Sequence, residues 1–126
     1  PVGWGVGSSC LGPGGFIPAF QNTLEGLKEF CAHLHEVWKL FVEYKAFEPS
    51  FSSATIADWG QSLLLANKLG DKAYTLVDLG HHLPNANIEQ IVSLLLMEGK
   101  LAGFHFNDSK YADDDRTAGS VKAYKQ

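Results

Sequence analysis

Hydrophobic positions along the chain recur first at helical spacing and then at strand spacing, and this order repeats. From Asn22 onward, apolar residues fall three or four positions apart, and Asn22 with Glu25 resembles a capping box. The pattern, whose last member is Val37, predicts an amphipathic helix that begins at Asn22 and extends to about Val37. Residues 38–45 then alternate with a period of two, which predicts a strand. Its two faces carry Leu40, Val42 and Tyr44 on one side and Phe41, Glu43 and Lys45 on the other.

A second helix and strand follow the first pair. Thr55 with Asp58 is placed to cap a helix, and Gly70 is placed to end it. Residues 74–79 are short and apolar, as expected of a buried parallel strand, and they lead into the loop Gly80-His81-His82.

A third helix and strand complete the pattern. Asn87 is placed to cap the helix, Gly99 to end it, and the apolar residues 101–106 predict the last strand. Strands that alternate with helices in this way predict an α/β fold with a parallel sheet and crossover helices.

Both ends of the chain lack such a pattern. We treat residues 1–126 as one domain in which residues 1–15 form a glycine-rich loop, with at most a short fourth strand, and residues 119–126 form a tail.

Composition narrows the function classes. The chain has 126 residues, a net charge of −4 and a pI near 5.6, so nothing indicates a nucleic-acid partner. No apolar run is long enough to span a bilayer, and no secretion signal is visible. Two cysteines are too few for a disulfide scaffold, so we expect a cytoplasmic protein.

Polar residues that could bind a metal ion or act in catalysis fall late in the predicted strands or just after them. They are Glu43, Lys45, Asp78, His81 and His105. Because ligand sites of parallel α/β sheets lie beyond the carboxyl ends of the strands, we expect these side chains to converge.

Each of these residues also has a simpler interpretation. Glu43 and Lys45 could form an ion pair on an edge strand, and Asp78 with His81 could belong to an ordinary polar turn. A lone histidine between two phenylalanines, as at His105, is typical of a core residue. Only the five residues taken together indicate a site.

The sequence Asp113-Asp114-Asp115 is a third acidic element, which in isolation is typical of a solvated loop. In an extended loop, Asp113 and Asp115 would lie on the same side and could bind a hard divalent ion. Carboxylate and imidazole ligands without cysteine suit manganese first, with magnesium, cobalt or zinc as alternatives. Two adjacent ions would hold substrate oxygens and polarise a carbonyl. No nucleophile motif, Walker loop or dinucleotide fingerprint is visible.

Four blocks together resemble bacterial L-rhamnose isomerases of the broad-specificity type, within the xylose isomerase-like barrels. The blocks are residues 42–45 (VEYK), 47–49 (FEP), 77–82 (VDLGHH) and 103–108 (GFHFND). The resemblance runs from about residue 38 to residue 118, with weaker support from residues 5–34, and its specificity comes from the order of the blocks.

This resemblance implies a (β/α)8 barrel with two divalent ions, usually manganese, that interconverts aldoses and ketoses such as L-rhamnose and L-rhamnulose. The implied partners are a small sugar substrate and further copies of the chain in a homo-oligomer. The implied ligands are Glu43, Asp78 and His105 for a structural ion and His81, Asp113 and Asp115 for the second ion, with Lys45, His81 and Asp113 as catalytic residues.

Only three or four of the eight βα units are expected here, so the chain is interpreted as a partial barrel and a fragment. Two alternatives stay open. Sugar epimerases and abasic-site endonucleases share this barrel type, although the acidic loops disfavour a DNA substrate. The chain could also be a non-catalytic partial barrel that folds by self-association, since its sheet edges would be exposed.

Overall fold

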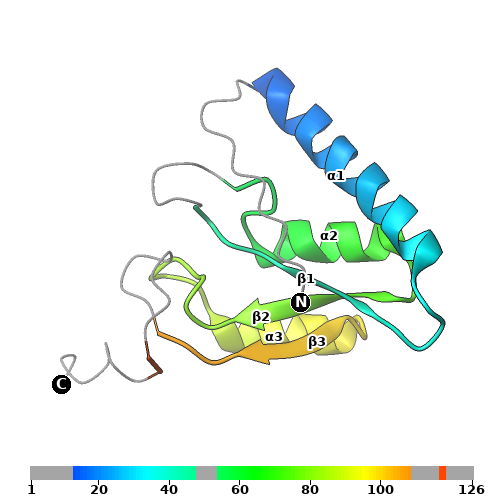
Figure 1. Cartoon of the computed structure of the whole chain (residues 1–126). Coiled ribbons are helices and arrows are strands. Elements are labelled where there is room, and N and C mark those ends of the chain that lie inside the picture. The colour runs from blue at the N-terminus through cyan, green and yellow to red at the C-terminus, as the bar shows by residue number, and fades with distance from the viewer. Residues whose placement is uncertain (1–12, 48–53, 109–116, 119–126) are drawn as a thin grey trace, which may run out of the picture.

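The computed structural model describes residues 13–47, 54–108 and 117–118 of the chain (Figure 1). Within these residues, helices and strands alternate along the sequence, as predicted. The elements are α1 (Pro13–His33), β1 (Leu40–Glu43), α2 (Trp59–Leu69), β2 (Ala73–Asp78), α3 (Ile88–Met97) and β3 (Leu101–His105).

The three strands form one parallel sheet in the order β1-β2-β3. Helices α2 and α3 lie on one face of this sheet, and α1 packs against α2 (Figure 1). No helix of the described residues covers the opposite face, which we call the open face. The predicted α/β fold with parallel strands and crossover helices is confirmed for this part of the chain.

The core lies between the sheet and the helices α2 and α3. Val77 of β2 packs with Ile91 and Leu95 of α3, and Leu101 of β3 joins them from the neighbouring strand. Because side chains alternate along a strand, the side of β2 that carries Val77 faces the helices, whereas Asp78 faces the other way. The core therefore holds β2 in place while its last residue is presented on the open face.

Caps fix the ends of the helices beside the sheet. The side chains of Asp58 and Asn87 each accept the backbone N–H of the residue three positions later, at 2.8 and 3.0 Å. Gly70 follows the last residue of α2, and Gly99, with φ of 65°, follows the end of α3. These four predictions are confirmed, with Asp58 rather than Thr55 as the residue that caps α2.

The prediction for the first helix was wrong at both ends. Helix α1 begins at Pro13, so Asn22 lies inside it and residues 13–15 are helical rather than part of a loop. Proline suits the first turn of a helix because the N–H that it lacks has no partner there. The helix ends at His33, before Val37, whose side chain is 75% exposed. The short fourth strand was considered for residues 1–15, of which residues 1–12 lie outside the described residues, as does the tail 119–126.

Strand β1 is shorter than the predicted range 38–45. It ends at Glu43, and beyond it the N–H of Lys45 donates to the carbonyl of Ile56 at 3.2 Å. The chain therefore turns toward the loop before α2 directly after Glu43.

A bulge in β3 changes the direction of its side chains. Thr75 of β2 pairs with Leu101, but the next residue, Leu76, pairs with Gly103, so that Ala102 is an extra residue. Leu101 faces the helices, and without the bulge His105, four residues later, would face them too. The bulge instead places His105 on the open face.

No helix in the described part of the chain combines the length and the apolar character that a membrane crossing requires.

Candidate metal centre

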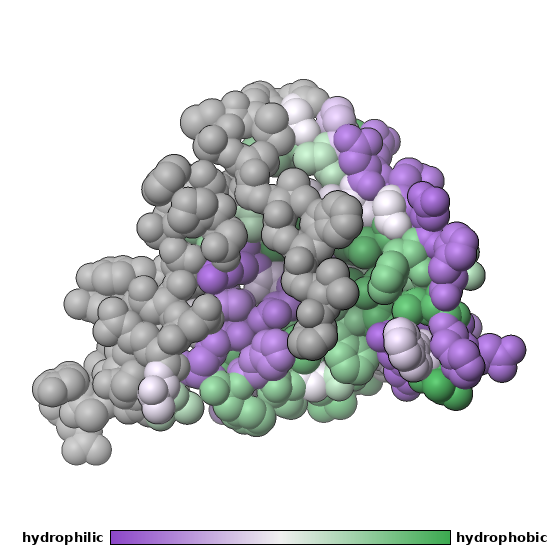
Figure 2. Space-filling model, viewed as in Figure 1, coloured by the Kyte–Doolittle hydropathy of each residue, from purple (hydrophilic) through white to green (hydrophobic). Residues whose placement is uncertain are grey.

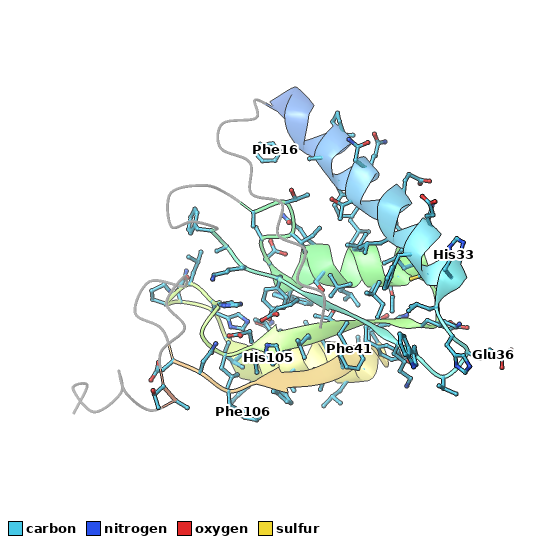
Figure 3. All side chains as sticks on the ribbon, viewed as in Figure 1. Phe16, His33, Glu36, Phe41, His105 and Phe106 are labelled. Carbon is cyan, nitrogen blue, oxygen red and sulfur yellow. The ribbon has the colours of Figure 1, made fainter. Side chains whose placement is uncertain are left out.

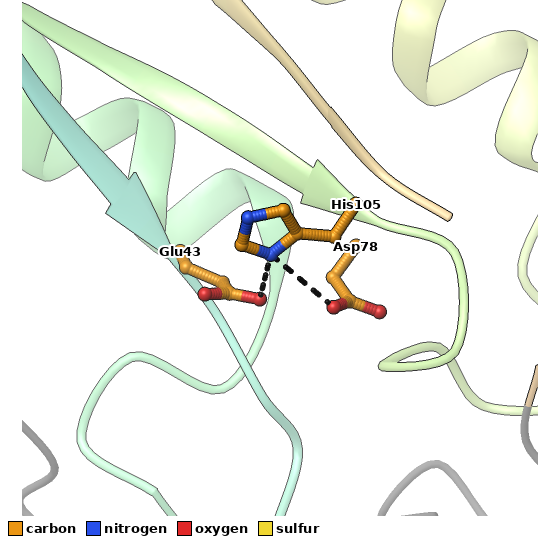
Figure 4. A group of neighbouring side chains, drawn as sticks. All are labelled: Glu43, Asp78 and His105. Carbon is orange, nitrogen blue, oxygen red and sulfur yellow. Dashed lines mark hydrogen bonds and ion pairs between the residues drawn. The ribbon is translucent and has the colours of Figure 1, made fainter. Parts of the chain in front are cut away.

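Three predicted ligands meet on the open face at the carboxyl ends of the strands (Figure 4). Glu43 is the last residue of β1, Asp78 the last of β2 and His105 the last of β3. Because the strands are parallel, all three ends lie at the same edge of the sheet, and Asp78 pairs directly with His105. The structure thus brings these three together, out of the five side chains that we expected to converge.

The three side chains approach each other closely enough to share one ion. His105 Nδ1 lies 3.1 Å from Glu43 Oε1 and 3.6 Å from Asp78 Oδ2. One nitrogen or oxygen from each residue falls within 4.8 Å of the other two. Two carboxylates and one imidazole suit hard or intermediate divalent ions such as Mn²⁺, so this donor set fits a metal.

The side chain of His105 is 55% exposed, so its interpretation as a core histidine was wrong. Figure 3 shows His105 near the carboxyl end of the sheet, whereas Glu36 lies beyond its opposite end. Among the described residues visible in Figure 2, hydrophilic ones gather where the strands end, beside hydrophobic ones. Among the described residues, no helix covers the centre on this face (Figure 1).

The two carboxyl groups differ in their electrostatics. The pKa of Glu43 is lowered to about 2, chiefly by its hydrogen bond to His81. Partial burial raises this pKa, and the hydrogen bond to His105 lowers it further. The pKa of Asp78 is raised, first because its burial penalises the charged form and also because Glu43 is near, although His81 opposes this shift. Asp78 is only 2% exposed. A cation between these groups would stabilise the charged form of both.

His81 joins the same group from the loop after β2. It is buried, and its Nδ1 lies 3.4 Å from Glu43 Oε1 and 3.7 Å from Asp78 Oδ2. The family resemblance implied that His81 is a ligand of a second ion and a catalytic residue, and the structure brings it beside the first set of ligands. Lys45 is partly buried, two residues beyond Glu43. Asp113 and Asp115 lie outside the described residues.

Two donors that were not predicted from the sequence hold the carboxylate of Asp78. The backbone N–H of Gly80 donates to Asp78 Oδ1 at 2.9 Å, and Asn107 Nδ2 donates to Asp78 Oδ2 at 2.9 Å. Asn107 follows His105 by two positions, so a polar side chain just past a strand end was the available signal.

Tyr44 and His82 form a second pair behind the centre. The hydroxyl of Tyr44 lies 2.5 Å from His82 Nε2, and the two rings meet edge to face. Burial raises the pKa of Tyr44 and lowers the pKa of His82, so the neutral imidazole accepts the hydrogen bond from the phenol. His82 was interpreted as structural, and this pair links the end of β1 to the loop after β2.

The chain is therefore an α/β protein with a candidate divalent-metal centre at the carboxyl edge of its parallel sheet. No protein-family model matches it. It is 53% identical over 121 residues to a probable sugar isomerase from Mesorhizobium japonicum and 50% identical over 121 residues to one from Rhizobium meliloti. Each alignment covers 96% of this chain, and the chain spans 28% of the length of each relative.

Proposed function

We propose that these residues form part of the active site of a metal-dependent sugar isomerase that interconverts an aldose and a ketose. The observation that carries the proposal is the convergence of Glu43, Asp78 and His105 at one sheet edge. It occurs in a chain that is 53% and 50% identical, over 121 residues, to two proteins named as probable sugar isomerases.

We propose further that the three βα units belong to a (β/α)8 barrel of the xylose isomerase-like type. Parallel strands, helices on one face and polar residues at the carboxyl ends of the strands support this, because barrel active sites are built in that place. In such a barrel the open face would line the interior.

The proposed substrate pair is L-rhamnose and L-rhamnulose, with related sugars, and the proposed cofactor is Mn²⁺ at two sites. The blocks that resemble L-rhamnose isomerases support this choice, since they include all three residues of the centre. We also propose a homo-oligomer in the cytoplasm, with the sugar as its small-molecule partner.

In this proposal Glu43, Asp78 and His105 would hold the ion. A divalent ion there supplies Lewis-acid polarisation of substrate oxygens. Glu43, with a pKa of about 2, stays ionised throughout the neutral range and needs no proton removed before it binds a cation. His81 is buried against both carboxylates, where its ring would help to orient them, and in the proposed reaction it would exchange a proton with a substrate hydroxyl. Lys45 and Asp113 are the other proposed catalytic residues, and Asp113 and Asp115 the other proposed ligands.

The test uses the natural polypeptide that contains this chain, stripped with EDTA and then supplied with Mn²⁺ and L-rhamnose. We expect ketose formation that requires the metal and is lost in Asp78→Asn. Asp71→Asn is the matched control, because Asp71 is an exposed aspartate just before the opposite end of β2.

Sugar turnover in EDTA, or full activity in a variant with both Asp78 and His105 changed to alanine, would overturn the proposal. Nicking of abasic DNA without turnover of any sugar would favour the endonuclease instead.

A further inference from the structure

We propose that Asn107 and Gly80 act as positioning residues that fix the carboxylate of Asp78 in the orientation needed to bind a metal ion. This inference rests on the proposed function and names the part of the chain that prepares one of its ligands. We call the three residues Asp78, Gly80 and Asn107 the carboxylate lock.

The lock is a closed set of hydrogen bonds. Gly80 shares its backbone N–H between Asp78 Oδ1 at 2.9 Å and Asn107 Oδ1 at 2.6 Å. Asn107 Nδ2 donates to Asp78 Oδ2 at 2.9 Å. Each oxygen of the carboxylate therefore has its own donor, and a rotation of the carboxylate would break both bonds.

The amide of Asn107 has a single orientation within the lock. Its oxygen accepts from Gly80, and its nitrogen donates to Asp78. If the amide were flipped, its N–H₂ would face the N–H of Gly80 and its oxygen would face a carboxylate oxygen, so both contacts would become repulsive.

Position 80 requires glycine because the side chain of Asn107 lies very close to its backbone. A Cβ at this position would lie 2.5 Å from Asn107 Oδ1 and 3.0 Å from its Cγ, which is closer than non-bonded atoms tolerate. Any side chain at position 80 would therefore push the amide of Asn107 away from Asp78. The absence of a side chain here serves the lock.

The lock also joins the two strand ends that present neighbouring ligands. Gly80 lies two residues beyond Asp78 of β2, and Asn107 lies two residues beyond His105 of β3. Between them, the N–H of Leu79 donates to the carbonyl of His105 at 3.1 Å. The distance from the carboxylate of Asp78 to the imidazole of His105 is thus set by contacts on both sides.

Two substitutions break the lock in different ways. Asn107→Ala deletes the amide, and Gly80→Ala displaces it. Partners that orient a metal ligand typically contribute 10-fold to 100-fold to metal affinity, so we expect each variant to raise the dissociation constant for Mn²⁺ by a factor in this range. Because the added methyl group has room once the amide is gone, Gly80→Ala should add little in the Asn107→Ala background.

The experiment titrates the EDTA-stripped natural polypeptide with Mn²⁺ alone and follows the electron paramagnetic resonance signal of the free ion. Asn85→Ala, in the exposed part of the same loop, and Gly26→Ala, where a Cβ meets nothing within 4 Å, are the matched controls and should bind as the unchanged protein does. Urea unfolding of each metal-free variant shows which ones are folded under the titration conditions.

The outcomes separate the two proposals. A purely structural tie would lower the urea midpoint of Asn107→Ala and Gly80→Ala but leave the dissociation constant of the folded protein unchanged, which would overturn the lock alone. Additive losses of affinity in the double variant would also overturn it. If the unchanged protein binds no Mn²⁺, the proposed function falls and the lock falls with it.

Discussion

Ser62 offers a test of how the sheet is fixed beneath the metal centre. It lies in α2 with no exposed surface, and its hydroxyl donates to the carbonyl of Val42 at 2.8 Å. Ser62 Oγ also lies 3.0 Å from the hydroxyl oxygen of Thr75, which is equally buried. Since a serine hydroxyl has one hydrogen, Thr75 is the donor of this second bond. Ser62 thus ties α2 to β1 at Val42, which is the residue before Glu43, and to β2 at Thr75.

The expected magnitude follows from burial. Ser62→Ala leaves the carbonyl of Val42 without this donor and the hydroxyl of Thr75 without its acceptor, and a buried polar group left unpaired costs about 1–3 kcal/mol. Thr75→Val keeps the shape of the side chain and removes one bond, which costs about 1 kcal/mol. The loss of unfolding free energy in the double variant should be smaller than the sum of the two single losses by at least about 0.5 kcal/mol. The reason is that the double variant leaves fewer unpaired groups than the two single variants together.

Urea unfolding in EDTA measures these differences as shifts of the midpoint at constant m-value. Strictly additive losses, within about 0.3 kcal/mol, would show that the two hydroxyl groups do not interact and would refute the reasoning. A Ser62→Ala variant as stable as the unchanged protein would refute it as well.

Other substitutions test the remaining features. The pKa of Glu43 is about 2 in the folded protein against an ordinary 4.5, so its stabilising effect is complete above pH 4.5 and is lost as the pH falls through 2. Glu43→Gln should therefore flatten the acid side of the stability curve in EDTA, and a curve as steep as that of the unchanged protein would contradict this account. Leu95→Ala, at a position with no exposed surface, should cost about 2–5 kcal/mol in urea unfolding, and a loss below 1 kcal/mol would contradict the described core. Asp58→Ala removes the cap of α2 and should cost about 1 kcal/mol, while Asp58→Asn, which keeps the accepting oxygen, should cost less.

Local signals predicted much of the fold. Asp58 and Asn87 are short polar residues before apolar helical stretches, and Gly70 and Gly99 follow them, so both helices could be bounded from the sequence alone. The alternation of helices and strands also predicted a parallel sheet. The start of the first helix was not predicted because Pro13 lies within a glycine-rich stretch, which is typical of a loop.

The candidate site was predicted in part because strand ends are visible in a sequence. Glu43 and Asp78 fall late in the predicted strands 38–45 and 74–79, which places them toward the carboxyl edge, and in the structure each is the last residue of its strand. His105 was predicted there too, but the bulge at Ala102 that turns it toward the open face depends on pairing with β2 and leaves no periodic signal. The role of Asn107 was not predicted for a related reason, since it depends on a contact with Gly80, 27 positions away.

The most direct test of the central claim is anomalous X-ray diffraction from crystals of the natural polypeptide grown with Mn²⁺, recorded on both sides of the manganese absorption edge. We expect a manganese peak within bonding distance of Glu43, Asp78 and His105. A well-ordered centre with no manganese peak among these side chains would contradict the assignment of this sheet edge as a metal centre.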